Sequence, residues 1–556
     1  MKKIIYVLGV LIMLLFTACG GNEKEKESQG EAAATVEKQA EQVLRFNLDA
    51  DPPSIDPQLN TDSSGAMVIN NTFEGLMRND ASGKPQPAVA GSVEVSEDKT
   101  VYTFHLKKNV KWSDGKAVKA EDFKYAWLRG LDPRVASEYA YQLYYIKGGQ
   151  DYFKGNGKRE DVGIEVVDEH TLKVVLEAPT PYFLNLVTFF TYMPVRKDIV
   201  EQKPEGWAKD PKLTISNGPF IVSEYKMNDK IILTPNENYW NRENIKLKKM
   251  VLTMIIEGST VLTAYDNNEI DVISGQVPVQ EIPKRQMEDS TFKTLPYLGT
   301  YYYLFNVDKA PTNDINVRKA LSLAIDREAI VNQITKAGQM PATGFVPNGL
   351  IDSRGNDFRA TAGDYGMSTT ANIELAREYL AKAGYPNGKG MPPVELMYNT
   401  SESHKAIAEA IQDMWKKNLG IDVTLANQEW AVFKTTRSMG NFQVMRSVWL
   451  GDYNDPMTFL DMWTSYSGNN NAQWRATEDG KFPENKKFTR LIEESKLVSG
   501  DSRDEKLYAA EKIMMDQAII APLYYYTGVV MIKDKVKNWE RDILGTWYFG
   551  NAEIQE

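Results

Sequence analysis

The sequence predicts an α/β protein that folds as two lobes. Short runs of β-forming residues alternate with segments whose apolar residues recur at helical spacing, a pattern typical of α/β lobes. Chain-breaking residues gather around 290–300 and again near 520, so we expect the chain to cross between the lobes more than once. The 556 residues, 42% hydrophobic and 25% charged, suffice for two or three domains of ~100–200 residues each.

The first residues have the form of a secretory signal. The segment MKKIIYVLGVLIMLLFTACGG places two lysines before an apolar run from Ile4 to Phe16, followed by small residues that end at Cys19. The apolar run is shorter than the ~20 residues that a membrane-spanning helix needs. Residues 1–18 are therefore predicted to be a signal peptide. Cys19 is the only cysteine, so no disulfide or thiolate metal site can form within the chain.

A polar stretch follows this signal. Residues 22–42 have only alanines and one valine as apolar residues and carry many charges, so they cannot bury enough surface to fold alone. We expect residues 19–42 to form a disordered tether with a mean reach of roughly 25 Å. The net charge of the chain is −10 and its body has no Lys/Arg-rich run, so neither nucleic acid nor an anionic membrane surface is an expected partner.

The first part of the body is rich in predicted strands. Residues 43–48, 100–106 and 171–177 are clusters of β-forming residues, separated by turn signals such as Ser113-Asp114-Gly115. A helix is predicted to start near Ala120.

The second part is richer in predicted helices. Residues 314–334 have apolar residues near helical spacing behind Asp314, a capping residue type. Residues 403–420 are predicted to form a helix that ends at Gly420, and residues 421–430 the strand that follows.

The residue patterns that mark catalysis or metal binding are missing from the sequence. The three histidines His105, His170 and His404 lie far apart, and none belongs to an HExxH or HxxxH arrangement. There is no P-loop, no GxGxxG after a strand and no GxSxG elbow. We therefore expect no enzyme activity, no metal and no cofactor, with an exported peptidase as the alternative from a different class.

The chemistry that stands out is aromatic. Tyrosines cluster at residues 139–145, 301–303 and 524–526. Such amphipathic rings often line sites that bind a polar ligand between apolar walls. Ordinary packing on strands is the alternative explanation for each cluster. The stretch SVWLGDYNDPMTFLDMW, residues 447–463, places Asp452 and Asp455 among further aromatic rings. A carboxylate in apolar surroundings requires a cation or donors, because desolvating an unpaired ion costs several kcal/mol. Three explanations are open: the partner is an internal Lys or Arg, the acid accepts backbone hydrogen bonds as a cap on the turn before Pro456, or a ligand provides the positive charge.

The chain contains a series of short motifs in this order: SIDP (54–57), FEGLM (73–77), KWSDGKAVKAEDF (111–123), NGPF (217–220), PNENYW (235–240), YYYLFNVDKAP (301–311), RKALSLAIDRE (318–328), NQEW (427–430) and GDYNDP (451–456). In this order the motifs resemble the oligopeptide-binding proteins of bacterial ABC importers, within the family 5 extracellular solute-binding proteins, and the resemblance covers residues 43–545. Each motif is weak by itself, and their order is specific.

The resemblance implies a periplasmic-binding-protein-like trap of type II, in the three-domain variant with discontinuous domains. Lobe I is expected from residues 43–72, 200–298 and 520–556, with an additional domain from 73–199, and lobe II from 299–519. The lobes would close over an extended peptide that is paired as an added strand, with its side chains in roomy hydrated pockets. Backbone pairing and adaptable water explain why such a site tolerates many sequences.

The resemblance also assigns site residues. Asp452 matches the aspartate that pairs with the peptide α-ammonium group. Three basic residues match positions that face the peptide carboxylate at different peptide lengths: His404, Arg437 and Arg446. For the two arginines, a structural salt bridge is the alternative. The peptide backbone and side-chain pockets are assigned to Thr61, Asp62, Ser63, Tyr139, Trp430, Val448, Trp449, Leu450 and Tyr526.

This chain departs from the family pattern at several positions. Thr335, with Lys336 beside it, stands where relatives carry a lysine that serves the shortest peptides, which puts dipeptide binding in doubt. Val448 replaces a glycine. Gly299 and Leu450 stand where some relatives have a disulfide.

The segment Phe16-Thr17-Ala18-Cys19 resembles a bacterial lipobox, with Phe16 where leucine is usual, and implies a lipid on Cys19. The sequence thus predicts a monomeric lipoprotein, held by its lipid on the extracytoplasmic face of the cell membrane, that passes oligopeptides to an ABC permease. The alternative is another ligand on the same scaffold: a murein peptide, a signalling peptide, or a metal or haem complex.

Overall fold

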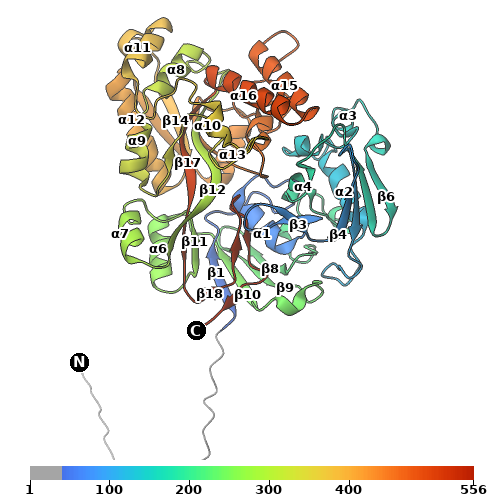
Figure 1. The fold of residues 1–556 in the computed structure, drawn as a ribbon. Coiled ribbons are helices and arrows are strands. Elements are labelled where there is room, and N and C mark those ends of the chain that lie inside the picture. Colours follow the sequence, from blue (N-terminus) through green and yellow to red (C-terminus); the bar gives the residue numbers. More distant parts are fainter. Residues whose placement is uncertain (1–40) are drawn as a thin grey trace, which may run out of the picture. The chain divides into compact units, whose positions relative to one another are not determined.

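The computed structural model describes residues 41–556, which form one compact unit (Figure 1). The predicted signal peptide, Cys19 and all but the last two residues of the predicted tether lie outside the described residues. The chain enters the fold through β1 (Val43–Asn47), a buried strand that confirms the prediction for residues 43–48.

One large sheet of eleven strands organises the described residues. Ten of them follow in the order β15 (Val423–Gln428), β14 (Val394–Asn399), β16 (Val444–Leu450), β12 (Phe292–Phe305), β17 (Ile520–Ile532), β11 (Val272–Ser274), β1, β10 (Lys249–Thr253), β9 (Lys230–Pro235) and β8 (Phe220–Lys226). The eleventh, β13 (Met340–Pro341), pairs with β17. Strands from distant parts of the chain thus lie side by side, as expected of a fold with discontinuous domains, and the α/β prediction is confirmed.

Two long antiparallel strands, β12 and β17, connect the two halves of this sheet (Figure 1). Toward one end of the pair, β17 continues the sheet through β11, and toward the other end β12 pairs with β16. The register between β12 and β17 shifts between Pro296 and Thr300, in the middle of the pair. The chain-breaking residues at 290–300 do not end the strand: Pro296 and Gly299 are accommodated by an irregularity within β12, where this strand passes from one half of the sheet to the other. Strand β17 begins at Ile520, close to the second group of chain-breaking residues.

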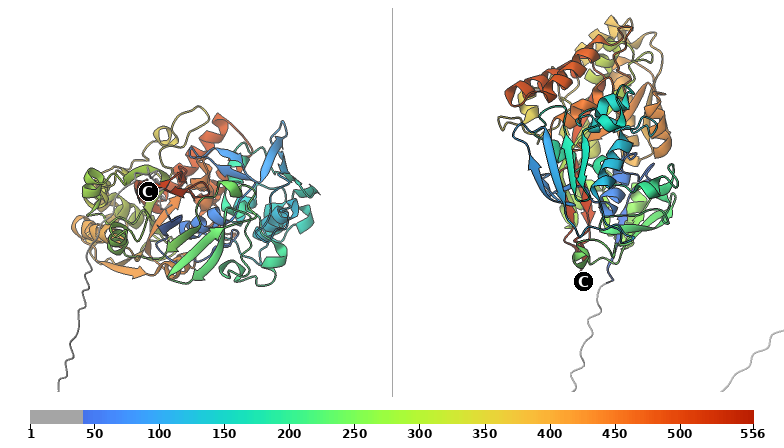
Figure 2. Two further views of the ribbon diagram at one scale, coloured as in Figure 1. Left: turned by 90° about the horizontal axis from the view of Figure 1, so that it is seen from below. Right: turned by 90° about the vertical axis from the view of Figure 1, so that its right-hand side faces the viewer.

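A second, smaller sheet is formed by the N-terminal part of the chain. Its order is β4 (Ala90–Val95), β5 (Val101–Leu106), β7 (Thr171–Val175) and β6 (Ile164–Asp168), which confirms the predicted strands at 100–106 and 171–177. Helix α2 (Ala120–Gly130) begins where the sequence predicts and packs against β6 and β7. Figures 1 and 2 show these elements together at one side of the described unit.

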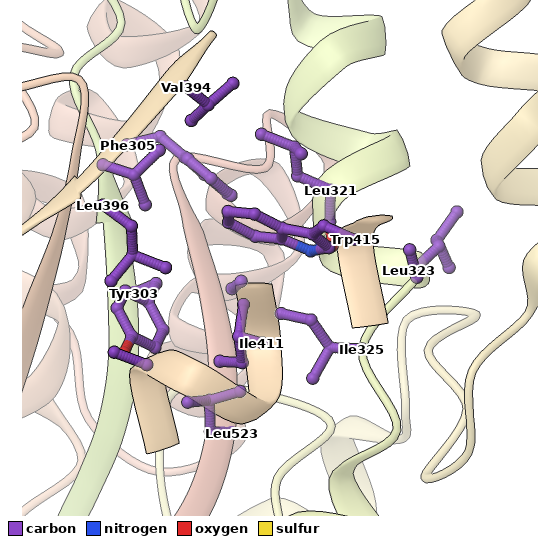
Figure 3. Close-up of a cluster of buried hydrophobic side chains, with 14 of the residues drawn as sticks. Tyr303, Phe305, Leu321, Leu323, Ile325, Val394, Leu396, Ile411, Trp415 and Leu523 are labelled. Atoms are coloured by element: carbon purple, nitrogen blue, oxygen red, sulfur yellow. The ribbon is translucent and has the colours of Figure 1, made fainter. Parts of the chain in front are cut away.

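Helices α8 (Ile315–Leu323), α11 (Ile373–Lys382) and α12 (Glu402–Leu419) cover the β14–β16 half of the large sheet (Figure 1). The indole of Trp415 on α12 is fully buried and donates a hydrogen bond of 2.8 Å to the carbonyl of Leu321 on α8. Its ring lies among side chains from α8 and from strands β12 and β14 (Figure 3). This apolar cluster fixes α12, which also carries His404, against the sheet.

The predicted helix over residues 314–334 is broken in the structure. Asp314 caps α8 as expected, but α8 ends at Leu323, and Asp326 caps a new short helix, α9 (Arg327–Ala329), which continues into the π-helix η6 (Ile330–Thr335). The reason is Arg327, whose buried guanidinium donates to the carbonyls of Pro522, Ile325 and Ser322. A straight helix would not satisfy these buried donors.

The predicted end of the next helix is confirmed. Helix α12 stops at Gly420, which has a left-handed φ of 71° and therefore suits glycine. The following strand, β15, ends at Gln428, earlier than predicted, because Glu429 accepts hydrogen bonds from two backbone N–H groups and starts helix α13 (Trp430–Ser438). This short helix matters for the site described below.

The remaining helices of at least seven residues are α1 (Ser63–Thr72), α6 (Gly258–Asp266), α7 (Ile282–Glu288), α15 (Pro483–Lys496) and α16 (Asp501–Asp516). Within residues 41–556, no helix has the length and apolar character needed to cross a membrane.

Candidate functional site

A cavity of about 470 Å³ lies where the two halves of the large sheet meet. Its walls come from the end of β1, the segment before α1, helices α12 and α13, strand β16 and the middle of β17. The cavity is lined by all of the residues that the sequence assigns to ligand binding: Thr61, Asp62, Ser63, Tyr139, His404, Trp430, Arg437, Arg446, Val448, Trp449, Leu450, Asp452 and Tyr526. The fold therefore brings together residues from Thr61 to Tyr526, which are 465 positions apart in sequence.

Asp452 is an acid of this cavity whose carboxylate has few partners. One carboxylate oxygen accepts a hydrogen bond of 3.2 Å from the hydroxyl of Tyr139, and the other is buried without a hydrogen-bond partner in the described part of the chain. Burial, with the nearby buried Asp461, raises the pKa of Asp452 well above its usual value, and the Tyr139 hydrogen bond opposes this only partly. The carboxylate thus lacks the internal cation or backbone donors that a purely structural role would provide.

Asp455, three residues further on, has those structural partners. Its carboxylate lies 2.6 Å from the guanidinium of Arg503 and accepts a hydrogen bond of 2.8 Å from the backbone N–H of Met457. It therefore both pairs with an internal arginine and caps the turn that contains Pro456. Both structural explanations for an acid in this stretch, an internal arginine partner and a cap on the turn at Pro456, apply to Asp455. Neither applies to Asp452.

The surroundings of Asp452 are rigid and aromatic. The Tyr139 ring packs near Trp449, with centroids 6.3 Å apart, and burial together with Asp452 keeps the Tyr139 pKa well above 10, so its hydroxyl remains a donor. The indole N–H of Trp449 donates to the carbonyl of Thr458, and the Thr458 hydroxyl accepts from the backbone N–H of Asp452. These bonds hold the carboxylate in place without neutralising its charge.

Two arginines, the buried Arg446 and the half-buried Arg437, bring positive charge to the same cavity. Arg446 on β16 donates to the amide oxygen of Asn399 at 3.1 Å and to the hydroxyl of Tyr526 at 3.4 Å, and it lies over the Tyr301 ring. Arg437 on α13 contacts only the hydroxyl of Ser447, at 3.5 Å. Both have a buried Nε without a hydrogen-bond partner, and neither forms a salt bridge to a carboxylate of residues 41–556. The salt-bridge alternative is therefore not realised for either arginine.

His404, at the start of α12, lies beside this positive charge. Its Nδ1 is 3.3 Å from the hydroxyl of Tyr301. Burial and the neighbouring Arg446 hold the His404 pKa well below its usual value, so the imidazole is neutral near pH 7 in the absence of a ligand. The sequence treats His404 as a basic residue, and in this structure it offers a neutral hydrogen-bonding group.

Two hydrogen-bonded contacts join α13 to the segment before α1 across the cavity. The indole N–H of Trp430 donates to the Asp62 carboxylate at 3.0 Å, while the opposite oxygen of that carboxylate caps α1. The ammonium of Lys434 donates to the carbonyl and the hydroxyl of Thr61, each at 2.7 Å. These contacts tie residues of the two predicted lobes together.

Sequence reasoning missed several charged residues of the cavity, among them Lys434 and Asp49. Lys434 shares one face of α13 with Trp430 and Arg437, so a helix prediction over 430–438 would have found it. Asp49 follows β1 with a left-handed φ of 81°, and burial raises its pKa to about 7, opposed by a hydrogen bond to Gln276 and by the charge of Arg446. No motif in the sequence marks Asp49.

The positions that depart from the family pattern are also placed. Thr335 lines the cavity and donates a hydrogen bond to Gln339, whereas Lys336 is exposed and is not part of the lining. Gly299 and Leu450 are cross-strand partners in the β12–β16 pair. Within residues 41–556, no group of three or more His, Cys, Asp or Glu side chains has a geometry that would hold a metal ion.

Comparison with known proteins identifies the family. Residues 84–471 match the model of the bacterial extracellular solute-binding proteins, family 5, middle region. The chain belongs to this family. It is 37% identical to the oligopeptide-binding protein OppA of Bacillus subtilis over 565 aligned positions, which cover 98% of each chain.

Two solved structures of family members indicate the conformation of this one. Haemophilus influenzae OppA in complex with the peptide RPPGFSPFR has a TM-score of 0.86 at 30% identity and covers 93% of this chain and 99% of its own. The unliganded open form of Escherichia coli MppA, a murein tripeptide-binding protein, scores 0.61 at 34% identity, covering 92% and 97%. This member of family 5 therefore resembles the peptide-bound relative more closely than the open one, consistent with the bonds that cross its cavity.

Proposed function

We propose that this protein captures oligopeptides by their backbone and termini and delivers them to an ABC-type permease. The observation that carries the proposal is the charge pattern of the cavity. Asp452 presents a buried carboxylate without a cation, and Arg446 and Arg437 present guanidinium groups without a carboxylate. A peptide has a free ammonium group at one end and a carboxylate at the other, so it supplies both missing partners.

The site residues then have distinct roles. Asp452 binds the α-ammonium group, supported by the hydroxyl of Tyr139. Arg437, Arg446 and His404 receive the carboxylate of peptides of different length. The main chain around 61–63 and 448–450 pairs with the peptide backbone as an added strand, and the rings of Tyr139, Trp430, Trp449 and Tyr526 bound the side-chain pockets.

Ligand capture couples to closure of the lobes. Lobe I is residues 43–72, 200–298 and 520–556, with the domain 73–199 attached, and lobe II is residues 299–519. The β12–β17 pair joins them, and its irregularity at Pro296–Thr300 is the expected hinge. Because a peptide contacts both lobes only when they are closed, binding shifts the population toward the closed form.

The protein works as a monomer on the extracytoplasmic face of the membrane, held by a lipid on Cys19. The support is the signal shape, the single cysteine and the polar stretch behind it. Two acyl chains bury many CH2 groups at ~0.8 kcal/mol each, so attachment is lasting. Cys19→Ser should give protein that remains a precursor or is shed from cells. A mature-length mutant that still fractionates with membranes would contradict the lipid anchor.

The protein carries its ligand without chemical change. Two relatives of known structure are described as parts of oligopeptide ABC transporters, and no pattern typical of a peptidase appears in the sequence. Native mass spectrometry after incubation with a mixed peptide library tests this. We expect 1:1 complexes with intact peptides, whereas cleavage products that accumulate with time, or no complex at all, would contradict the proposal.

A further inference from the structure

Lys434 is a buried amine without an acid partner. Its side chain lines the cavity, and within residues 41–556 it forms no salt bridge. Two of the three donors of an ammonium group are used by the carbonyl and the hydroxyl of Thr61. Both of these acceptors are neutral, so they leave the positive charge unbalanced and one N–H free for another acceptor.

A second unpaired cation lies one helical turn away. Arg437 stands three residues after Lys434 on α13, so the two side chains are neighbours on one face of the helix, and like charges at this spacing disfavour a helix. In the part of the chain that the structure describes, Arg437 donates a hydrogen bond only to the hydroxyl of Ser447, and its buried Nε has no hydrogen-bond partner. Lys434, which is buried, and Arg437, which is half-buried, therefore line the same cavity, and neither forms a salt bridge among residues 41–556.

The carboxylates nearest to this pair are engaged elsewhere or act only at a distance. Asp62 accepts from the indole of Trp430 and caps α1, and both Asp62 and Glu138 act on Lys434 only through space. Burial, with the neighbouring Arg437, lowers the Lys434 pKa to about 8, which still leaves most of the amine charged at pH 7. A negative group placed between the two side chains would relieve both their mutual repulsion and their desolvation.

We propose that Lys434 and Arg437 form an anion subsite that binds a carboxylate of the peptide. This inference rests on the proposed function and adds a ligand preference to it. Two sources of the carboxylate share the same chemistry: an acidic side chain within the peptide, or the C-terminus of a peptide too short to reach Arg446. In both cases Lys434 donates its remaining N–H to the bound oxygen while Thr61 holds the ammonium in place.

The experiment compares matched peptides with the wild type and with Lys434→Met, which keeps an unbranched side chain of similar length and removes the charge. Tetrapeptides of alanine with Glu or Gln at each internal position test the side-chain source. Di- and tripeptides of alanine as free acids and C-terminal amides test the terminal source. Lys434→Arg retains a charge, and Lys405→Met on the exposed surface of α12 controls for loss of a lysine as such.

For at least one matched pair, we expect the wild type to prefer the carboxylate form by about tenfold or more, as for a hydrogen bond between charged groups. Lys434→Met should reduce this ratio several-fold, while Lys434→Arg and Lys405→Met keep most of it. The pair that responds identifies the source. If Lys434 only holds the structure together through Thr61, Lys434→Met should weaken binding of both peptides in each pair equally. The ratio of their affinities would then be unchanged from the wild type, and that result would overturn the proposal.

A failure of the proposed function would look different. In that case the all-alanine tetrapeptide would not bind the wild type, and no ratio could be measured. If that peptide binds and depends on Asp452, the general function holds whatever the result at Lys434.

Discussion

Replacing Asp452 with asparagine should stabilise the ligand-free protein at neutral pH, although it removes the charge assigned to ligand binding. In the structure, one oxygen of this buried carboxylate accepts only from Tyr139, and the other has no hydrogen-bond partner among residues 41–556. Asparagine has nearly the same shape and no charge. It still offers an oxygen to Tyr139.

Asparagine leaves its amide nitrogen unpaired where the carboxylate oxygen was, so the substitution relieves only the extra cost of burying a charged rather than a neutral group, which is about 1–3 kcal/mol. At ~2.1 cal/mol/K per residue, roughly 500 folded residues correspond to about 1 °C in Tm per kcal/mol, so we expect a rise of about 1–3 °C. The effect has a defined pH dependence. The folded-state pKa of Asp452 is raised above the value near 4 of an unfolded chain, so the wild type loses stability as pH rises from about 4 through the folded pKa.

The assay is differential scanning calorimetry of protein freed of ligand, with removal checked by native mass spectrometry. The difference in Tm between Asp452→Asn and the wild type should be near zero at pH 4 and grow toward pH 8. Asp455→Asn is the matched control: it strands the buried Arg503, so it should lower the free energy of unfolding by about 3–5 kcal/mol. If Asp452→Asn destabilises the protein as Asp455→Asn does, Asp452 has a structural partner and the reasoning fails.

Two further predictions concern closure and peptide length. Peptide addition should reduce the radius of gyration in solution scattering and raise Tm, because binding shifts the population of the ligand-free protein toward the closed form; an unchanged scattering curve with bound peptide would contradict the trap mechanism. Because peptides of different length end at different distances from Asp452, Arg437→Ala and Arg446→Ala should weaken peptides of three, four and five residues unequally. Equal losses at every length, or none, would show that carboxylate recognition is not distributed between these residues.

Local features of the fold were predictable because their causes are local. The strand at 43–48 is a run of β-forming residues, and the end of α12 follows from a glycine with a left-handed conformation. The break after Leu323 was not predictable, because it exists to bury Arg327 against the carbonyl of Pro522, nearly 200 residues away. The continuity of β12 through Pro296 depends in the same way on pairing with a distant strand.

The candidate site shows the same division. Every residue assigned to ligand binding from the family resemblance lines the cavity, because the resemblance carries information from many related chains. Lys434 is not among the positions that the resemblance assigns, and its partner Thr61 is 373 residues away in sequence. From residue types alone, physical reasoning predicted that an acid in the 447–463 stretch needs a positively charged partner or hydrogen-bond donors. That reasoning could not say which acid has an internal partner. The structure shows that Asp455 pairs with Arg503, whereas Asp452 has no such partner among residues 41–556.

The measurement that tests the central claim most directly is a calorimetric cycle at Asp452. A short peptide and its N-acetylated form are titrated into the wild type and into Asp452→Asn. Removing either partner of a buried ion pair typically costs ~2–5 kcal/mol, so each single change should weaken binding roughly 30-fold to several thousand-fold. The double change should cost much less than the sum, because neither partner is then charged. Equal binding of the free and acetylated peptides by the wild type would contradict the assignment of Asp452 to the peptide amino terminus.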